Sequence, residues 1–334
     1  MRGRLALGWL TAALVVGLAP AGSLAAGPAA AAASGPGATA SRAEAGPRLS
    51  VPAAALRRAV SCSGKARRGR TPVLLVHGTG TTGKETWRLG WQQSLRAEGR
   101  AVCVVDLPRF GTGDVQDNAQ YVVHALRHLQ GKAGDRDVSV VALSKGMTET
   151  LLALRVWPDV ARQVDDVVGL AGVMDRGSRA IAAQCAADPC VPALHQVATG
   201  SAFLRAVTRH PLPRGISYTA VSTPLDRTVT PQPGANRQRG VRPVSIDAVC
   251  PGRAARFGVG HAQVLGDAVA RALVRDALAR RGPASPARVP RSTCGREHFP
   301  GFDEAGFTRL AAVVAARRHA TTTREPRVRS WLRR

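Results

Sequence analysis

The feature that most constrains the fold is an apolar strand that turns directly into a helix at a single serine. Residues 137–143 form a compact apolar run that is typical of a buried strand. Ser144 follows, and residues 145–157 read as a helix that a proline then ends. Ala142 and Gly146 flank the serine at two positions on either side, and both are small enough for a tight nucleophile elbow. No other serine of the chain has a glycine two residues later.

Apolar runs alternate with helical segments on both sides of this turn. The expected strands span residues 72–76, 101–107, 137–143, 167–171 and 216–221. The expected helices span residues 87–98, 114–130, 145–157, 264–273 and 304–318. Such alternation predicts an α/β fold, with a mostly parallel central sheet flanked by helices.

The serine needs partners, because its hydroxyl is a poor nucleophile at neutral pH. A neighbouring base must activate it, and an acid must orient that base. In α/β-hydrolases the acid and then the histidine follow the serine along the chain. Asp226 lies in the loop after the expected strand at 216–221, and His261 lies in a glycine-bounded loop before an expected helix. The sequence therefore predicts Ser144 as nucleophile, Asp226 as orienting acid and His261 as general base.

A loop rich in glycine and threonine, residues 77–83, follows the first expected strand. An oxyanion needs backbone N–H donors where its charge develops. One donor is expected from Lys145, directly after the nucleophile, and the other from this loop. Thr79 is expected to add a hydroxyl donor to its own N–H.

The same loop raises a nucleotide-binding alternative from a different functional class. Gly78, four further residues, Gly83 and Lys84 nearly form a Walker A phosphate loop. That motif requires Ser or Thr after the lysine to bind magnesium, and this chain has Glu85 there. The sequence thus favours the oxyanion loop, and no cofactor or metal is expected.

The N-terminus has the order of features of a secretory signal. Arg2 and Arg4 precede an apolar run at residues 5–18, and small residues follow. The run is too short to span a bilayer, and no later stretch reaches about 18 uninterrupted apolar residues. We expect residues 1–26 to be a signal peptide and the mature protein to be secreted into the extracellular space.

Composition divides the rest of the chain into three parts. Residues 27–50 are rich in Ala, Gly, Pro and Ser and are expected to form a flexible leader. Residues 51–320 are expected to form one α/β-hydrolase catalytic domain. Residues 321–334 form a basic tail that is expected to stay mobile.

The chain is strongly basic, with 47 Lys and Arg against 22 Asp and Glu and a formal net charge of +25. The basic residues are spread along the chain, and no helix-turn-helix, RNA-recognition or zinc-finger pattern accompanies them. We therefore expect no specific nucleic-acid partner. The charge predicts transient, nonspecific attraction to lipid interfaces or an anionic cell surface, and the protein is expected to be a monomer.

Six cysteines in an exported chain favour disulfides over metal ligands. They are Cys62, Cys103, Cys185, Cys190, Cys250 and Cys294. Spacing alone does not select among their possible pairings. No CxxC motif occurs, which disfavours a zinc site.

Several segments together resemble the Candida antarctica lipase B-like family of secreted lipases and esterases. In chain order these are residues 71–83, 103–108, 118–123, the elbow at Ser144, 200–204, 226–231, 248–250 and 261–262. The resemblance runs from about residue 60 to residue 295. It implies an α/β-hydrolase fold and the hydrolysis of ester or lipid substrates through an acyl-serine.

Matched residue by residue, the resemblance implies a triad of Ser144, Asp226 and His261, with Thr79 and Lys145 at the oxyanion hole. It also implies the disulfides Cys62–Cys103 and Cys250–Cys294, which leaves Cys185–Cys190 as a short loop. The family has Gln where this chain has Lys145, so an ammonium beside the nucleophile is expected to alter substrate preference or the pKa of the histidine. The family has proline at His77, which is expected to pack or hydrogen-bond without a catalytic role.

The sequence thus predicts a secreted serine carboxylesterase or triacylglycerol lipase that forms an acyl-Ser144 intermediate. Two alternatives remain open. One is an acyltransferase or polyester hydrolase on the same fold. The other is a catalytically silent secreted binding protein that keeps the fold.

Overall fold

A computed structural model describes residues 45–333 of the chain. The predicted signal peptide at 1–26 and most of the predicted leader at 27–50 lie outside the described residues. Within residues 45–333 the strands form one seven-stranded sheet in the order β1-β3-β2-β4-β5-β6-β7. All neighbouring strands are parallel except β1 and β3, which run antiparallel. The predicted α/β-hydrolase fold, with a mostly parallel sheet, is confirmed.

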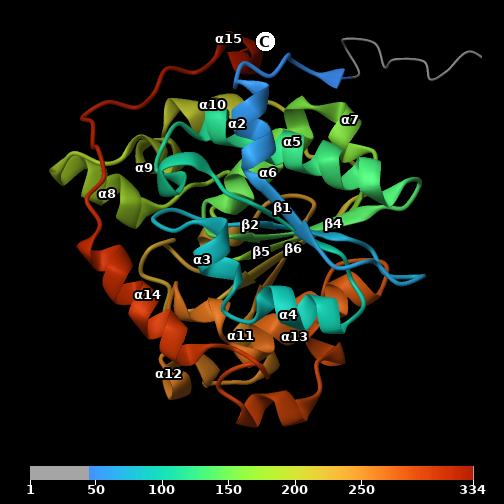
Figure 1. Cartoon of the computed structure of the whole chain (residues 1–334). Helices are drawn as coiled ribbons and strands as arrows, with labels where there is room; N and C mark the ends of the chain where they lie inside the picture. The colour runs from blue at the N-terminus through green and yellow to red at the C-terminus, as the bar shows by residue number, and fades with distance from the viewer. Residues whose placement is uncertain (1–44, 334) are drawn as a thin grey trace, which may run out of the picture. The chain divides into compact units, whose positions relative to one another are not determined.

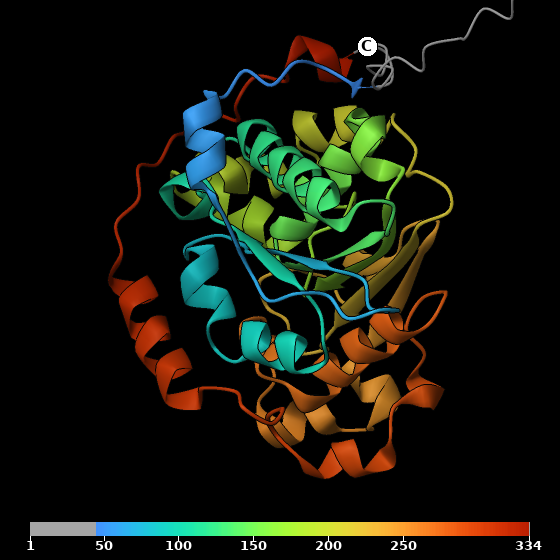
Figure 2. The same cartoon turned by 45° about the vertical axis from the view of Figure 1, so that its right-hand side comes forward.

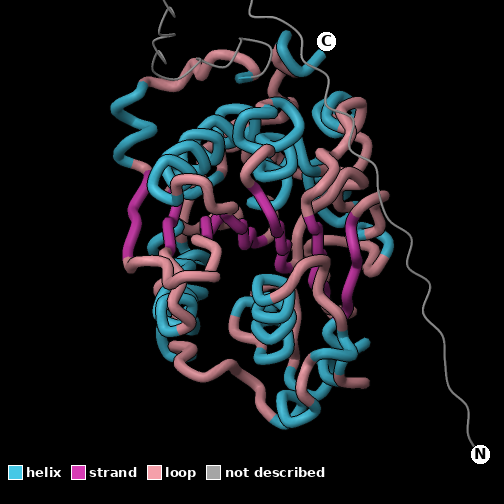
Figure 3. Tube along the Cα trace, turned by 90° about the vertical axis from the view of Figure 1, so that its right-hand side faces the viewer, coloured by secondary structure: helices cyan, strands magenta, loops and turns pink. Residues whose placement is uncertain are grey.

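The strands are short and lie in the middle of the fold, with helices on both sides (Figure 3). They are β1 (Val60–Ser63), β2 (Val73–Val76), β3 (Val102–Val105), β4 (Val138–Leu143), β5 (Val164–Leu170), β6 (Ser217–Ser222) and β7 (Val241–Ser245). Because β2, β4, β5 and β6 are parallel, their carboxyl ends meet at one edge of the sheet. Loops that leave this edge can bring distant residues together.

Helices cover both faces of the sheet (Figures 1 and 2). On one face lie α2 (Ala53–Arg58), α5 (Val115–Ala133), α6 (Gly146–Val156), α7 (Pro158–Ala161), α8 (Arg179–Ala187), α9 (Pro192–Val197), α10 (Ala202–Val207) and α15 (Ser330–Arg333). On the other lie α3 (Gly83–Trp87), α4 (Trp91–Ala97), α11 (Ile246–Val249), α12 (Arg253–Phe257), α13 (Ala268–Ala279) and α14 (Glu304–Ala316).

Two hydrophobic clusters lie on opposite faces of the sheet. Strand β2 shows why: Leu74 and Val76 belong to one cluster, whereas Val73 and Leu75 belong to the other. Successive side chains of a strand point to opposite faces, so a central strand covered by helices on both sides is apolar throughout. This burial accounts for the continuous apolar runs that predicted the strands.

The structure corrects some of the expected elements. The helix expected at 87–98 is shorter: α4 begins at Trp91, after Gly90, whose φ of 107° a residue with a side chain rarely adopts, and the separate helix α3, which ends at Trp87, was not predicted. The outer strands β1 and β7 were not predicted. Strand β1 is largely exposed, and β7 contains Pro243, so neither has the apolar run of a central strand. The helix expected from residue 264 begins at Ala268, with Asp267 as its N-cap.

Both ends of the described chain pack against the domain. The indole N–H of Trp157 donates to the carbonyl oxygen of Pro47 at 2.8 Å, which places the last residues of the expected flexible leader on the domain surface. The expected mobile tail is also packed. The carboxylate of Glu325 accepts the N–H groups of Ala202 and Phe203 at the start of α10, and Leu332 is fully buried. Composition did not reveal these contacts, because each depends on a partner more than 100 residues away.

Three disulfides join the six cysteines: Cys62–Cys103, Cys185–Cys190 and Cys250–Cys294. The pairings implied by the family resemblance are therefore the ones present. Cys62 and Cys103 lie directly opposite each other in the antiparallel β1–β3 pair, so the first bridge joins an edge strand to the sheet. No helix of the described chain is both long enough and apolar enough to cross a membrane.

Candidate active site

Ser144 lies at a tight turn between β4 and α6. Its φ is +53°, an uncommon left-handed conformation for a residue with a side chain. Neighbouring atoms leave no room for a side chain at Gly146, two residues after the serine, or at Gly78 in the loop after β2. A Cβ placed on Gly146 would lie 2.5 Å from the carbonyl oxygen of His77, and one placed on Gly78 would lie 2.9 Å from the Cβ of Ser144. The structure thus contains the strained elbow that the strand–serine–helix pattern predicted.

The loops after β6 and α12 bring Asp226 and His261 to this serine. The Nε2 atom of His261 lies 2.9 Å from the hydroxyl oxygen of Ser144. The Nδ1 atom of the same ring lies 2.9 Å from Oδ2 of Asp226. Residues separated by 117 and 35 positions therefore form one continuous chain of hydrogen bonds. This arrangement can move a proton from the hydroxyl to an imidazole whose orientation a carboxylate controls.

Asp226 is buried, and donors surround its carboxylate. Its Oδ1 atom accepts the backbone N–H groups of Thr228 at 2.9 Å and Val229 at 2.8 Å, while Oδ2 faces His261. Backbone donors of this kind satisfy the oxygens of a buried carboxyl group. The loop after β6 therefore supplies both the carboxylate and the donors that it needs.

The loop after β2 places Thr79 beside the elbow. The Thr79 hydroxyl is buried and has no hydrogen-bond partner within residues 45–333. Over the same residues, the backbone N–H groups of Thr79 and Lys145 have no backbone acceptor. Buried donors without partners are costly unless a ligand satisfies them. Thr79 and Lys145, the two residues expected at an oxyanion hole, thus lie at the elbow. Their backbone N–H groups and the Thr79 hydroxyl are not used in hydrogen bonds within residues 45–333.

The side chain of Lys145 points away from solvent and into a buried pair. Its ammonium forms an ion pair with Glu149, one helical turn further along α6, and the amide of Asn118 donates to the same carboxylate at 2.9 Å. Burial lowers the pKa of Lys145 and raises that of Glu149. The sequence analysis expected an ammonium that acts on substrate or histidine and did not identify Glu149. The i, i+4 spacing of two charges in an otherwise apolar helix is the signal that indicates such a pair.

Comparison with known proteins agrees with this geometry. No family model matches the chain. Lipase B of Pseudozyma antarctica is 28% identical over 188 residues, which cover 56% of this chain and 55% of that protein. The crystal structure of Aspergillus fumigatus lipase B superposes with a TM-score of 0.74 at 27% identity, covering 86% of this chain and 73% of that one.

The chain has the α/β-hydrolase fold and resembles lipase B. The predicted resemblance is thereby confirmed. The matched sequence region spans only about half the length of the curated relative.

His77 has a structural position in this fold. Its ring is fully buried, Nδ1 donates to the carbonyl oxygen of Gly78 at 2.9 Å, and Nε2 accepts the N–H of Leu107 at 2.9 Å. Burial, reinforced by the charge of Lys145, lowers the pKa of His77 to about 3. The ring is therefore neutral over the physiological range and ties the oxyanion loop to the segment after β3.

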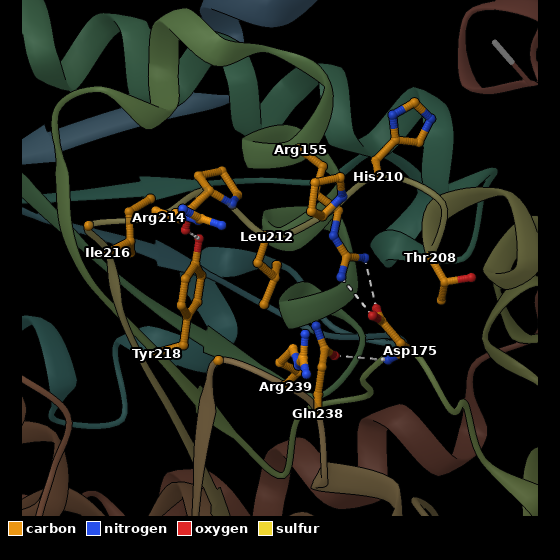
Figure 4. A pocket seen from close by; sticks show the side chains of 14 residues that line it. Arg155, Asp175, Thr208, His210, Leu212, Arg214, Ile216, Tyr218, Gln238 and Arg239 are labelled. Carbon is orange, nitrogen blue, oxygen red and sulfur yellow. Dashed lines mark hydrogen bonds and ion pairs between the residues drawn. The ribbon is translucent and has the colours of Figure 1, made fainter.

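The lining of a cavity of about 660 Å³ includes none of Ser144, Asp226, His261 or Thr79 (Figure 4). Arg155 points into the cavity, and its guanidinium donates two hydrogen bonds to Asp175, at 2.8 and 2.6 Å (Figure 4). This cavity has no nucleophile–base pair among its lining residues. The hydrogen-bonded serine and histidine lie at the elbow and not in this cavity.

Proposed function

We propose that the protein is a serine hydrolase that cleaves carboxylic esters, including lipid esters, through an acyl-Ser144 intermediate. The observation that supports this most strongly is the uninterrupted hydrogen-bond chain from the Ser144 hydroxyl through His261 to Asp226. The lipase B relatives support ester hydrolysis as the reaction class.

In the proposed acylation step, His261 Nε2 takes the proton from the Ser144 hydroxyl as Oγ attacks the ester carbonyl carbon. The N–H groups of Thr79 and Lys145 and the Thr79 hydroxyl donate to the resulting oxyanion. The carbon–oxygen bond to the alcohol then breaks, and the imidazolium protonates the leaving alcohol. Asp226 stabilises that imidazolium and fixes the ring tautomer.

In the proposed deacylation step, the same residues act on water. His261 removes a proton from a water molecule as its oxygen attacks the acyl carbon. The second tetrahedral intermediate breaks its bond to Ser144 Oγ, which recovers the proton from His261. The carboxylic acid leaves and the free enzyme is restored. No redox partner or metal takes part in these steps.

We further propose that the enzyme acts outside the cell as a monomer. Support comes from the three disulfides, which persist in oxidising compartments, and from the N-terminal signal pattern. The net charge of +25 favours transient contact with anionic surfaces and no specific nucleic acid.

Replacement of the nucleophile tests the proposal. Ser144→Ala is expected to lower kcat for p-nitrophenyl butyrate by at least about 10⁴-fold, because no other group can form the acyl-enzyme. Ser292→Ala, at an exposed serine, is the matched control and should keep wild-type kcat. Retention of activity in a folded Ser144→Ala variant would remove Ser144 from the mechanism.

Two further measurements separate the alternatives. A fluorophosphonate probe should label wild-type protein and not Ser144→Ala; absence of labelling in the wild type would favour a catalytically silent binding protein. Product analysis in the presence of competing alcohols, and with polyester film, would identify an acyltransferase or a polyester hydrolase. A panel of esters of increasing acyl length then defines the preferred substrate.

A further inference from the structure

The loop that contains Thr79 is contacted from outside the α/β core by the end of α14. Helices α14 and α3 lie side by side in both views of the fold (Figures 1 and 2). We propose that Arg317, directly after α14, is a positioning residue. Through its contact with Gly80 it holds the oxyanion loop, residues 77–83, in position. This inference rests on the proposed function, since it assigns Thr79 to the oxyanion hole.

Arg317 makes direct contact with the loop backbone. Its Nη1 atom donates to the carbonyl oxygen of Gly80, the residue after Thr79, at 2.9 Å. The same atom donates to Oε2 of Glu85 at 3.0 Å, and Nη2 pairs with Oε1. Val314, one turn earlier, packs against the same glycine, because a Cβ placed on Gly80 would lie 3.3 Å from its Cγ1. Backbone next to Thr79 is therefore fixed from one side by α14.

Glu85, which accepts hydrogen bonds from Arg317, is itself held in position by hydrogen bonds. Its carboxylate accepts the N–H of Thr82 at 2.8 Å, while the Thr82 hydroxyl accepts the N–H of Glu85 at 3.1 Å. This reciprocal capping box fixes the start of α3, directly after the oxyanion loop. Hydrogen bonds from Arg317 lower the pKa of Glu85 to about 2, so the carboxylate is ionised near neutral pH.

A second segment, which has strained backbone, also contacts Gly80. Arg109, Phe110 and Gly111 follow one another with φ values of 52°, 59° and 68°. Two consecutive residues with side chains in this region cost energy, and such strain persists where other contacts enforce it. Here the carbonyl oxygen of Phe110 accepts the N–H of Gly80 at 2.8 Å. The two backbone polar groups of Gly80 are thus used by two different segments.

Arg317 contacts both the capping carboxylate of Glu85 and the strained segment at residues 109–111. Its guanidinium lies 4.1 Å from the centroid of the Phe110 ring, which is within the range of a cation–π contact. One side chain therefore contacts the loop carbonyl, the capping carboxylate and the ring of the strained segment. Planar stacking and a forked set of donors are properties of arginine that lysine lacks.

The position of the donors matters more to the transition state than to the bound ester. An oxyanion hole stabilises charge that develops only during the reaction, and small misplacements of reacting groups are costly. Loss of the Arg317 contacts should therefore lower kcat and leave KM almost unchanged. A purely structural role would instead lower the unfolding midpoint and leave the kinetics of the folded enzyme intact.

The test compares full-length wild type with Arg317→Ala, Arg317→Lys and the matched control Arg309→Ala. Arg309 is an exposed arginine of the same helix, with only a distant partner in Asp303. Arg317→Ala is expected to lower kcat by about 10- to 100-fold with KM changed by less than about threefold. It should also weaken inhibition by phenylboronic acid, whose tetrahedral adduct uses the oxyanion hole, by a similar factor. Arg317→Lys should recover part of the loss, and Arg309→Ala should match wild type.

Three results would overturn the inference. They are wild-type kcat in folded Arg317→Ala, an increase of KM alone, and a kcat loss without weaker boronic-acid inhibition. If Arg317→Ala is unfolded at the assay temperature, Arg317→Lys decides: lowered kcat at constant KM supports the role, and wild-type kcat rejects it. Failure of the proposed function is distinguishable, because wild-type protein would then neither hydrolyse esters nor react with a fluorophosphonate.

Discussion

Two buried aspartates near opposite ends of the parallel strands, Asp226 and Asp166, differ in the hydrogen bonds that their carboxyl groups accept. Asp226, after the carboxyl end of β6, is 4% exposed, and Asp166, near the start of β5, is 2% exposed. Asp226 accepts two backbone N–H groups and faces His261. Asp166 has an oxygen with no partner within residues 45–333, and burial, aided by the nearby charge of Asp165, raises its pKa to about 8.

The difference shows that backbone geometry, and not burial alone, decides whether the oxygens of a buried carboxyl group find hydrogen-bond donors. The loop after β6 turns sharply, so its N–H groups are free to point at Asp226. Asp166 lies within a strand that pairs with β4 on one side and β6 on the other, so backbone N–H groups are used by the sheet. The loop after β6 thus supplies donors to its buried acid, whereas strand β5 supplies none to Asp166 Oδ1 within residues 45–333.

The largest expected effect is a loss of kcat on replacement of Asp226. Asp226→Asn keeps the shape of the side chain but removes the charge that orients and stabilises His261, so kcat should fall by about 10³- to 10⁴-fold. Steady-state kinetics with p-nitrophenyl butyrate measure this effect. Asp166→Asn should leave kcat unchanged. If the two variants lowered kcat equally, the inferred difference between Asp226 and Asp166 would be wrong.

A third buried acid, Glu149, tests whether a charged partner can replace backbone donors. Glu149→Gln leaves the ammonium of Lys145, which is only 1% exposed, without its carboxylate. Removal of one partner of a buried pair costs about 3–5 kcal/mol, so the free energy of unfolding in urea should fall by that order. The double variant Lys145→Gln/Glu149→Gln should lose much less, because no unpaired charge remains. Additive losses in this cycle would show that the two side chains do not stabilise each other.

The smallest expected effect is a gain in stability at Asp166. The pKa of Asp166 is about 8 in the fold against 3.8 for a free side chain, so the unfolded chain loses its proton first as pH rises. Stability is therefore lost progressively between about pH 4 and pH 8 and is unaffected by this group below that window. Asp166→Asn removes the dependence and should raise the free energy of unfolding by about 1–3 kcal/mol at pH 8, with no gain near pH 4.

Urea unfolding at several pH values measures this gain. Asp135→Asn, at an exposed position, is the control. It should change the free energy of unfolding only slightly, and by the same amount at pH 4 and pH 8. A gain at Asp166→Asn that is constant from pH 4 to pH 8 would show that ionisation of this group is not its cause.

Local pattern accounts for the part of the site that sequence analysis predicted. The elbow at Ser144 depends on contiguous residues, because the apolar strand, the small flanking residues and the helix all adjoin it. Asp226 and His261 required one further rule, that loops after parallel strands meet at one edge. Arg317 and Glu85 were not recognised together, because 232 residues separate them and each alone resembles an ordinary surface charge.

By itself the sequence predicted the five central strands, the strand–serine–helix turn at Ser144 and the family resemblance, since these depend on periodicity and on short motifs. Tertiary structure alone decided which buried charges are satisfied, where the side chain of Lys145 points and how residues 321–333 pack. Those outcomes depend on groups that are distant along the chain but adjacent in space, and hydrophobic periodicity does not encode such contacts.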